Sequence, residues 1–102
     1  MPDDSSQTLV TRNESASRYE IYSDGALAGF AEYRESGTAT VFTHTETLPA
    51  FAGKGMGLAL VADALADAVS RDRTIVPECP FVARYLQRND VPGAVIEWPP
   101  SE

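Results

Sequence analysis

The feature that most constrains this chain is a change of hydrophobic period across three alternating glycines, Gly53, Gly55 and Gly57. Before the glycines, residues 38–46 are rich in Thr and Val, which suit a pleated strand. After them, apolar residues recur at helical spacing, at Leu58, Val61, Leu65, Ala68 and Val69. A strand, a glycine loop and a helix N-terminus in this order present unpaired backbone N–H groups, and the helix dipole adds to their attraction for an anion. The stretch therefore predicts a binding site for phosphate groups.

The segments on either side of this stretch predict an α+β fold. Polar and apolar residues alternate from Arg18, Asp24-Gly25 is typical of a hairpin turn, and a second strand follows over residues 26–35. The helix after the glycines is expected to be anchored on the sheet by Leu58, Val61 and Leu65. Residues 74–76 predict a short strand, and Pro80 suits the first position of a second helix. The expected order is β-β-β-α-β-α: an antiparallel meander followed by helix, strand and helix in a mixed sheet, with the first helix crossing between parallel or splayed strands.

The chain has 102 residues, the size of one small domain. We expect a single domain over residues 17–98, a disordered tail without periodicity over residues 1–16, and a short tail over residues 99–102. No stretch reaches the roughly 18–20 apolar residues of a membrane span, and no apolar signal run is present near residue 1. We therefore expect a cytoplasmic protein, either a monomer or a weak homodimer.

The charge balance bears on possible partners. Eight basic and 15 acidic residues give a net charge of −7. This charge disfavours nucleic acid and anionic membranes, because both are bound through basic patches. A positively charged substrate such as an amine would be attracted. Since Cys79 is the single cysteine and His44 the single histidine, we expect no internal disulfide and no metal site.

The spacing of the glycines excludes two common phosphate-binding motifs. A P-loop has four residues between its glycines and ends in Lys-Ser/Thr, and the dinucleotide fingerprint is GxGxxG. Only 45 residues follow Gly57, too few for the remaining strands of a dinucleotide-binding domain. The alternative to a phosphate site is a flexible loop whose glycines only cap the helix.

Four residues are candidates for chemistry. His44 and Glu46 lie two apart on a strand, so they share a face, and both can accept protons; alternatively they are solvated polar residues of an edge strand. Cys79 is at the expected start of the second helix, where the dipole stabilises a thiolate. It is a nucleophile, a general acid toward a leaving thiolate, or a buried residue that only packs. Tyr85, two turns further on, either donates a proton or packs in the core.

Several motifs, taken in order, resemble the short, single-domain (YjdJ-type) branch of the GNAT acetyltransferases. They are His44-Thr45-Glu46, then Gly53-Lys54-Gly55-Met56-Gly57 with Leu60-Val61, then Val76-Pro77-Glu78-Cys79-Pro80-Phe81-Val82 with Tyr85. The segment from Asp24-Gly25 through Ala28-Gly29-Phe30 to Tyr33 fits as well. The resemblance covers about residues 18–90.

The resemblance implies an acetyltransferase that transfers an acetyl group from acetyl-coenzyme A (acetyl-CoA) to a primary amine of a small molecule or a protein. It implies that the cofactor pyrophosphate rests on the backbone amides of Gly53, Lys54, Gly55, Met56 and Gly57. It implies that the pantetheine arm lies between the splayed strands, and we expect cofactor contacts at Thr47, Leu48, Pro80 and Phe81. Glu46 or His44 would then act as the base. Cys79 or Tyr85 would protonate the leaving thiolate, unless Cys79 itself carries the acetyl group.

The sequence departs from the family pattern at three places. Ala52 stands where the wider superfamily begins its loop motif with Arg or Gln, and Cys79 replaces the usual Asn. Asn89-Asp90 stands where close relatives tend to carry His-Pro. The first departure little affects a phosphate held by the backbone, whereas the other two leave the catalytic assignment open. Two further functions fit the residues: a non-catalytic module that binds coenzyme A or an acyl-CoA, and a different nucleotide- or phosphate-binding domain.

Overall fold

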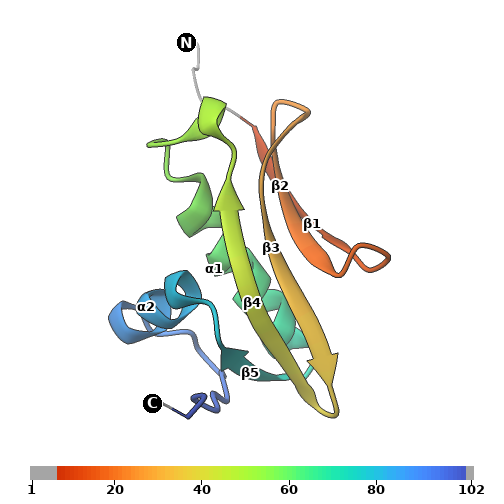
Figure 1. The fold of residues 1–102 in the computed structure, drawn as a ribbon, viewed down its shortest axis with the longest axis vertical. Helices are drawn as coiled ribbons and strands as arrows, with labels where there is room; N and C mark the ends of the chain where they lie inside the picture. Colours follow the sequence, from red (N-terminus) through yellow and green to blue (C-terminus); the bar gives the residue numbers. More distant parts are fainter. Residues whose placement is uncertain (1–6, 101–102) are drawn as a thin grey trace.

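The computed structural model describes residues 7–100, which contain a five-stranded mixed sheet and two α-helices (Figure 1). Four strands form an antiparallel meander: β1 (Thr8–Asn13), β2 (Arg18–Ser23), β3 (Ala26–Ser36) and β4 (Ala39–Thr47). The fifth strand, β5 (Thr74–Pro77), pairs with β4 in parallel. The predicted α+β class, meander and mixed sheet are confirmed.

Strand β1 is an addition to the expected order. We expected a disordered tail up to residue 16, and this expectation is wrong for residues 8–13, which pair with β2 along their whole length. The turn after β1 contains no glycine. Instead, Asn13 Oδ1 accepts hydrogen bonds from Ser15 Oγ and Ala16 N at 3.0 and 3.2 Å, and Ser17 adopts a φ of 55°. The remainder of the expected tails at residues 1–6 and 101–102 lies outside the described residues.

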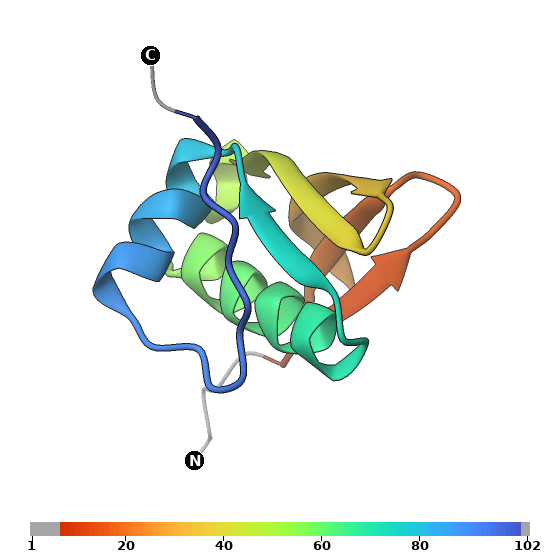
Figure 2. The same ribbon diagram turned by 90° about the horizontal axis from the view of Figure 1, so that it is seen from below.

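Helix α1 (Met56–Ser70) follows β4 and packs on one face of the sheet, as Figure 2 shows. Its buried residues are Met56, Gly57, Leu60, Val61, Ala64, Leu65 and Ala68. The helix is confirmed, but one expected anchor is wrong, because Leu58 is 56% exposed whereas Leu60 is fully buried. At roughly 100° per residue, Leu58 lies about 110° from the centre of the buried arc, at its edge.

Side chains from β2, β3, β4, β5 and both helices form one core. Its largest fully buried members are Ile21, Phe42, Leu60, Leu65, Ile75, Val61 and Val82. A polar contact also ties β2 to α1, because the Tyr19 hydroxyl donates to Asp67 Oδ2 at 2.7 Å. Burial, reinforced by this hydrogen bond, raises the pKa of Tyr19. The sheet and α1 are therefore joined both by apolar packing and by a specific polar contact.

The second helix, α2 (Pro80–Arg88), lies beside α1 at the β5 end of the sheet (Figure 2). The chain then returns along β5, where Ile75 N donates to Val95 O at 2.8 Å and Glu97 N donates to Ile75 O at 2.9 Å. These bonds cover the outer edge of β5. The face of the sheet opposite α1 carries no helix among residues 7–100 and is turned toward the viewer in Figure 1. We call it the open face.

Candidate active site

The glycine loop follows the short 3₁₀ turn η1 (Pro49–Phe51) and leads directly into α1. Gly53 and Gly55 have φ values of 79° and 77°, a left-handed conformation that other residues adopt at a cost of roughly 1–2 kcal/mol. Gly55 is the N-cap of α1, and its carbonyl accepts a hydrogen bond from Ala59 N at 3.1 Å. The N–H groups of residues 56–58 come before the first hydrogen bond of the helix, so they have no acceptor within it. No side chain caps the helix at this end. They are available to an anion at the positive end of the helix dipole.

A pocket of about 250 Å³ joins this loop to the end of β4 and to α2. It is lined by six predicted cofactor residues, Thr47, Gly53, Gly55, Met56, Gly57 and Phe81, and by Phe51, Ala52 and Leu58. Gly57 is tightly packed, because a Cβ built there would lie 2.9 Å from Phe81 Cζ and 3.4 Å from Thr47 Oγ1. A Cβ at Gly53 or Gly55 would meet no atom within 4 Å. The loop therefore has free space beside it, while glycine at position 57 lets three elements meet.

Strands β4 and β5 separate next to this pocket. They pair in parallel from Ala39↔Thr74 to Phe42↔Pro77, and the pairing ends there although β4 continues to Thr47. Cys79 N then donates to Phe42 O at 2.8 Å, and the chain turns into α2. The second half of β4, residues 43–47, consequently has no strand partner on its β5 side. The parallel pairing and the splay predicted for these neighbours are both present.

His44 and Glu46 lie together on the open face. His44 Nε2 and Glu46 Oε1 are 3.2 Å apart, and the two side chains are 54% and 49% exposed. The register pairs them with Glu32 and Phe30 of β3, and the His44 and Phe30 ring centroids are 6.3 Å apart. The predicted shared face is confirmed. A proton can pass between His44 and Glu46, and between this pair and a group that arrives from solvent.

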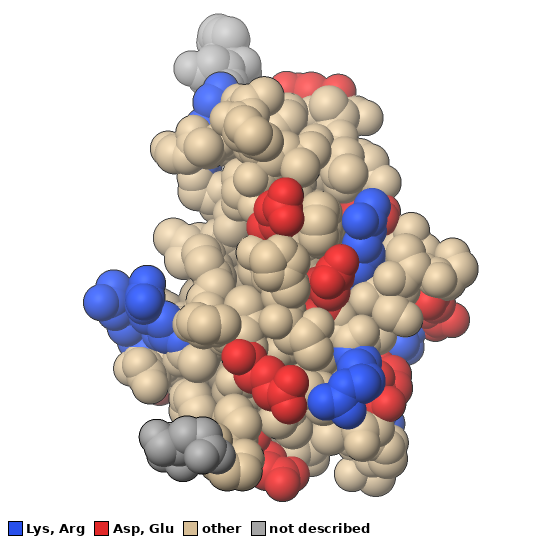
Figure 3. Space-filling model, viewed as in Figure 1, with Lys and Arg blue, Asp and Glu red and all other residues tan. Residues whose placement is uncertain are grey.

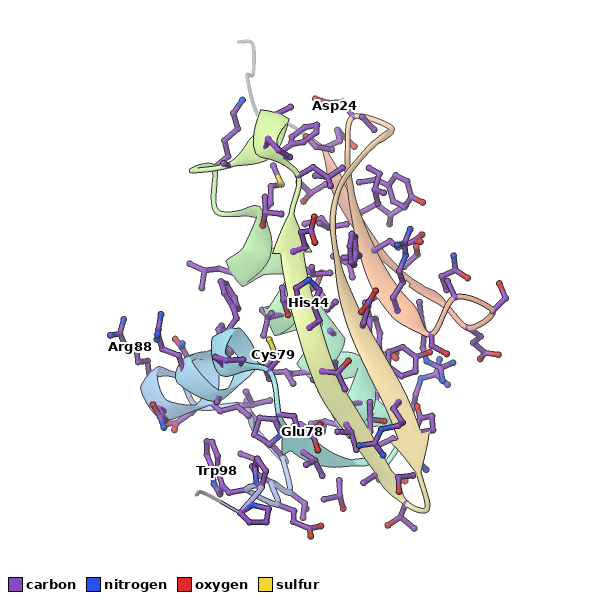
Figure 4. All side chains as sticks on the ribbon, viewed as in Figure 1. Asp24, His44, Glu78, Cys79, Arg88 and Trp98 are labelled. Carbon is purple, nitrogen blue, oxygen red and sulfur yellow. The ribbon has the colours of Figure 1, made fainter. Side chains whose placement is uncertain are left out.

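Cys79 lies on the other side of β4. It is the N-cap residue of α2, as predicted, and is only 3% exposed. Its Sγ donates a weak hydrogen bond to Thr45 Oγ1 at 3.4 Å. Because Thr45 stands between His44 and Glu46 in the strand, its side chain points to the opposite face. Two pairs thus flank one strand segment, His44–Glu46 on the open face and Thr45–Cys79 on the helix side. Figure 4 labels one member of each pair, His44 and Cys79.

The other predicted residues lie around the margin of the pocket. Tyr85 is half-buried and lines a smaller hollow of about 100 Å³, together with Leu58, Phe81, Arg84, Arg88 and Asn89. The Tyr85 hydroxyl makes no hydrogen bond to any residue between 7 and 100. Leu48 N donates to Ala28 O at 2.8 Å, which fixes the entry to the loop. Lys54 and Pro80 are exposed.

Several residues at the site were not predicted from the sequence, among them the polar residues Thr45, Arg84 and Arg88. Strand alternation could have suggested that Thr45 points toward the second helix. The two arginines follow Phe81 at positions i+3 and i+7, so helical spacing places them on one face of α2. Whether a carboxylate neutralises them depends on the tertiary structure.

A second polar cluster on the open face surrounds Glu20. Its carboxylate accepts hydrogen bonds from Arg18 Nε at 2.8 Å, Tyr22 Oη at 2.8 Å and Asn13 Nδ2 at 3.1 Å. The hydrogen bond from Arg18, aided by those from Tyr22 and Asn13, lowers the pKa of Glu20 despite its burial. The Arg18 guanidinium also lies over the Phe30 ring, 4.5 Å from its centroid. The Glu20 carboxylate is therefore charged at neutral pH, and its three hydrogen-bond donors come from β1 and β2.

Two further features concern possible ligands and membranes. Over residues 7–100, no three His, Cys, Asp or Glu side chains gather in a way that could hold a metal ion. Neither helix in this range is long and apolar enough to cross a bilayer.

Sequence comparison agrees with this geometry. Residues 18–92 match the family described as GCN5-related N-acetyl-transferase. The match spans most of the 102-residue chain, so the protein belongs to the GCN5-related N-acetyltransferase family. Comparison with curated protein sequences finds no significant match. Membership of the family suggests acyl transfer, without naming the acceptor.

Proposed function

We propose that this protein transfers an acetyl group from acetyl-CoA to a primary amine. The observation that carries the proposal is the junction of the glycine loop with α1. There, two left-handed glycines, the unbonded N–H groups of residues 56–58 and a pocket of about 250 Å³ converge. This combination suits a diphosphate held mainly by backbone groups.

The residues along the proposed cofactor path fit a long, thin ligand. Gly53, Gly55 and the first turn of α1 would hold the pyrophosphate, with exposed Lys54 beside it. The pantetheine arm would follow the unpaired edge of β4 beyond Phe42, between this strand and α2. Thr47 and Phe81, which already line the pocket, would contact it. When bound, acetyl-CoA supplies an acetyl group activated as a thioester.

The acceptor would approach from the open face. An amine is protonated at neutral pH, so a base must remove a proton before attack. Glu46 Oε1 or His44 Nε2 would take it, directly or through a water molecule, and their 3.2 Å contact lets the proton pass between them. The net charge of −7 favours a cationic acceptor. Because both side chains are about half exposed, a bulky amine such as a protein side chain or N-terminus has access.

Groups on the splayed strand would assist the transfer. Backbone N–H groups of residues 43–47 that have no strand partner would stabilise negative charge on the acetyl oxygen. Cys79 has two possible roles. It could donate its thiol proton to the departing CoA thiolate. Alternatively, its Sγ would bond to the acetyl carbon while the CoA thioester bond breaks and CoA leaves with the Cys79 thiol proton. The amine nitrogen would then bond to the acetyl carbon, the bond to Sγ would break, and Cys79 would regain a proton that the amine gives up. Tyr85 is the other candidate proton donor.

The experiment measures thiol release from acetyl-CoA with a panel of amines, together with CoA binding by calorimetry. We expect turnover with at least one amine, and we expect Glu46→Gln to lower kcat while CoA still binds. Glu32→Gln is a matched control, because Glu32 occupies the neighbouring strand on the same face. A fully active Cys79→Ala protein would exclude both roles of Cys79.

The half-exposed acceptor side also favours a second candidate, a module that binds coenzyme A or an acyl-CoA without turnover. CoA binding with no turnover on any amine would support this module. If ATP or NAD raises Tm whereas CoA does not, both the acetyltransferase and the CoA-binding module are excluded. The protein then has a different nucleotide-binding function.

A further inference from the structure

The basic residues of this acidic protein fall into two groups. Five of the eight lie within 4 Å of a carboxylate: Arg12, Arg18, Arg34, Arg71 and Arg73. The other three, Lys54, Arg84 and Arg88, pair with no carboxylate anywhere in residues 7–100. In a chain with a net charge of −7, these three cations have no carboxylate within 4 Å among the described residues 7–100. Their location therefore indicates where an external anion would be favoured.

All three unpaired cations border one continuous surface. Lys54 belongs to the glycine loop, beside the larger pocket. Arg84 and Arg88 line the adjoining hollow of about 100 Å³. The two pockets share Leu58 and Phe81, so they are neighbours along the groove between α1 and α2. Figure 3 shows basic side chains projecting at the α2 edge of the molecule, and Figure 4 labels Arg88 there.

The two arginines stand one helical turn apart, which is unfavourable for like charges that lack a counter-ion. The helix dipole favours Arg88, in the last turn of α2, but not Arg84 in the middle of the helix. A hollow of about 100 Å³ corresponds to roughly three water molecules, enough for a phosphate group. Paired guanidinium groups suit the several oxygens of a phosphomonoester dianion.

We propose that Arg84 and Arg88 bind the 3′-phosphate of coenzyme A, and thereby select CoA thioesters over thioesters that lack this group. The inference rests on the proposed function, because it requires the pyrophosphate at the glycine loop. From there, the nucleotide end of the ligand would pass Leu58, which lines both pockets, and reach the arginine pair. The loop alone would accept any diphosphate, so the arginines supply the selectivity that the loop lacks.

The test compares CoA with dephospho-CoA, which differs only in the 3′-phosphate, by calorimetry on the full chain. We expect the wild-type protein to bind CoA about 10- to 100-fold more tightly, the effect of losing charge-assisted hydrogen bonds. In Arg84→Gln/Arg88→Gln, we expect CoA affinity to fall to that of dephospho-CoA, with dephospho-CoA affinity unchanged. Arg34→Gln removes an exposed cation that pairs with Glu78 elsewhere, and should preserve the preference.

Three results of this calorimetry would overturn the inference. Equal wild-type affinities for the two ligands would overturn the inference and leave the proposed function intact. A double variant that loses affinity for both ligands by the same factor would also overturn it, because the arginines would then act on the shared part of the ligand. If the wild-type protein binds neither ligand, the proposed function fails and this inference fails with it.

Discussion

Replacing Gly57 by alanine should separate cofactor binding from the stability of the fold. Gly57 lies in the first turn of α1 with helical backbone, so alanine gains up to about 1 kcal/mol in helix propensity. Its Cβ would lie 2.9 Å from Phe81 Cζ, roughly 0.6–1.1 Å closer than a favourable carbon–carbon contact. Phe81 is 37% exposed, so its ring can move outward at less than the roughly 1–3 kcal/mol cost of overpacking a closed core. We expect the free energy of unfolding to change by less than about 1 kcal/mol.

The effect of Gly57→Ala on binding should be larger. Both the new methyl group and the displaced Phe81 ring would occupy the pocket of about 250 Å³, where the proposed cofactor passes the first turn of α1. We expect Kd for CoA to rise at least about tenfold, equivalent to about 1.4 kcal/mol of binding free energy. Calorimetry measures the binding change, and urea unfolding measures the stability change on the same protein.

Gly25→Ala is the matched control. Gly25 has a φ of 87°, and a Cβ there would meet no atom within 4 Å, so the substitution adds backbone strain of about 1–2 kcal/mol without a clash. This loss would lower Tm by about 4–8 °C per kcal/mol and leave CoA binding unchanged, because Gly25 is in the β2–β3 turn. A Gly57→Ala protein that binds CoA like the wild type would refute the placement of the cofactor. A loss of several kcal/mol in its stability would refute the argument that Phe81 can move.

Three further predictions concern the fold. Leu60→Ala should cost about 2–5 kcal/mol in urea unfolding and Leu58→Ala less than about 1 kcal/mol, because Leu60 is fully buried and Leu58 is 56% exposed; equal losses would contradict this assignment of faces. The pKa of Glu20 is lowered in the folded state, so its contribution to stability is present above the unfolded value of about 4.3 and is lost as pH falls through the folded pKa. Glu20→Gln should therefore flatten the fall in Tm below about pH 4.3, and an unchanged profile would argue against this cause. Finally, hydrogen exchange should protect amides of β1 that bond to β2 more than those of the following turn; exchange as fast as in an unfolded peptide would contradict the strand.

Most of the elements could be predicted because local chemistry and period agree. Gly25 marks the first predicted hairpin, and Pro80 begins α2 where its missing N–H costs nothing. Strand β1 could not be predicted in this way. Its turn depends on the Asn13 side chain and on a left-handed Ser17, neither of which is a strong sequence signal. An edge strand of this kind is defined by its partner more than by its own composition.

The site shows the same division between local and tertiary information. Periodicity predicted an amphipathic α1. Which residues of the helix are buried depends on how the helix is oriented on the sheet, and for this reason Leu58 lies at the pocket and Leu60 in the core. Likewise, the sequence lists Arg84 and Arg88 among eight basic residues without distinguishing them. Only the fold shows that the other arginines have carboxylate partners within residues 7–100 and that these two do not.

The end of the β4–β5 pairing has the strongest bearing on whether this chain can catalyse transfer or only bind a cofactor. A glycine loop and a helix N-terminus suffice for binding a phosphate. The proposed transfer would also need the acetyl group to be within reach of groups on both faces of β4, because His44–Glu46 and Thr45–Cys79 stand on opposite sides. A fully paired β5 would close the edge between them. The pairing stops at Pro77, which has no N–H to donate, and α2 begins three residues later. In the proposed reaction the open edge beyond Phe42 is therefore where donor and acceptor meet, and this edge arises from the proline-rich connection rather than from the glycine loop.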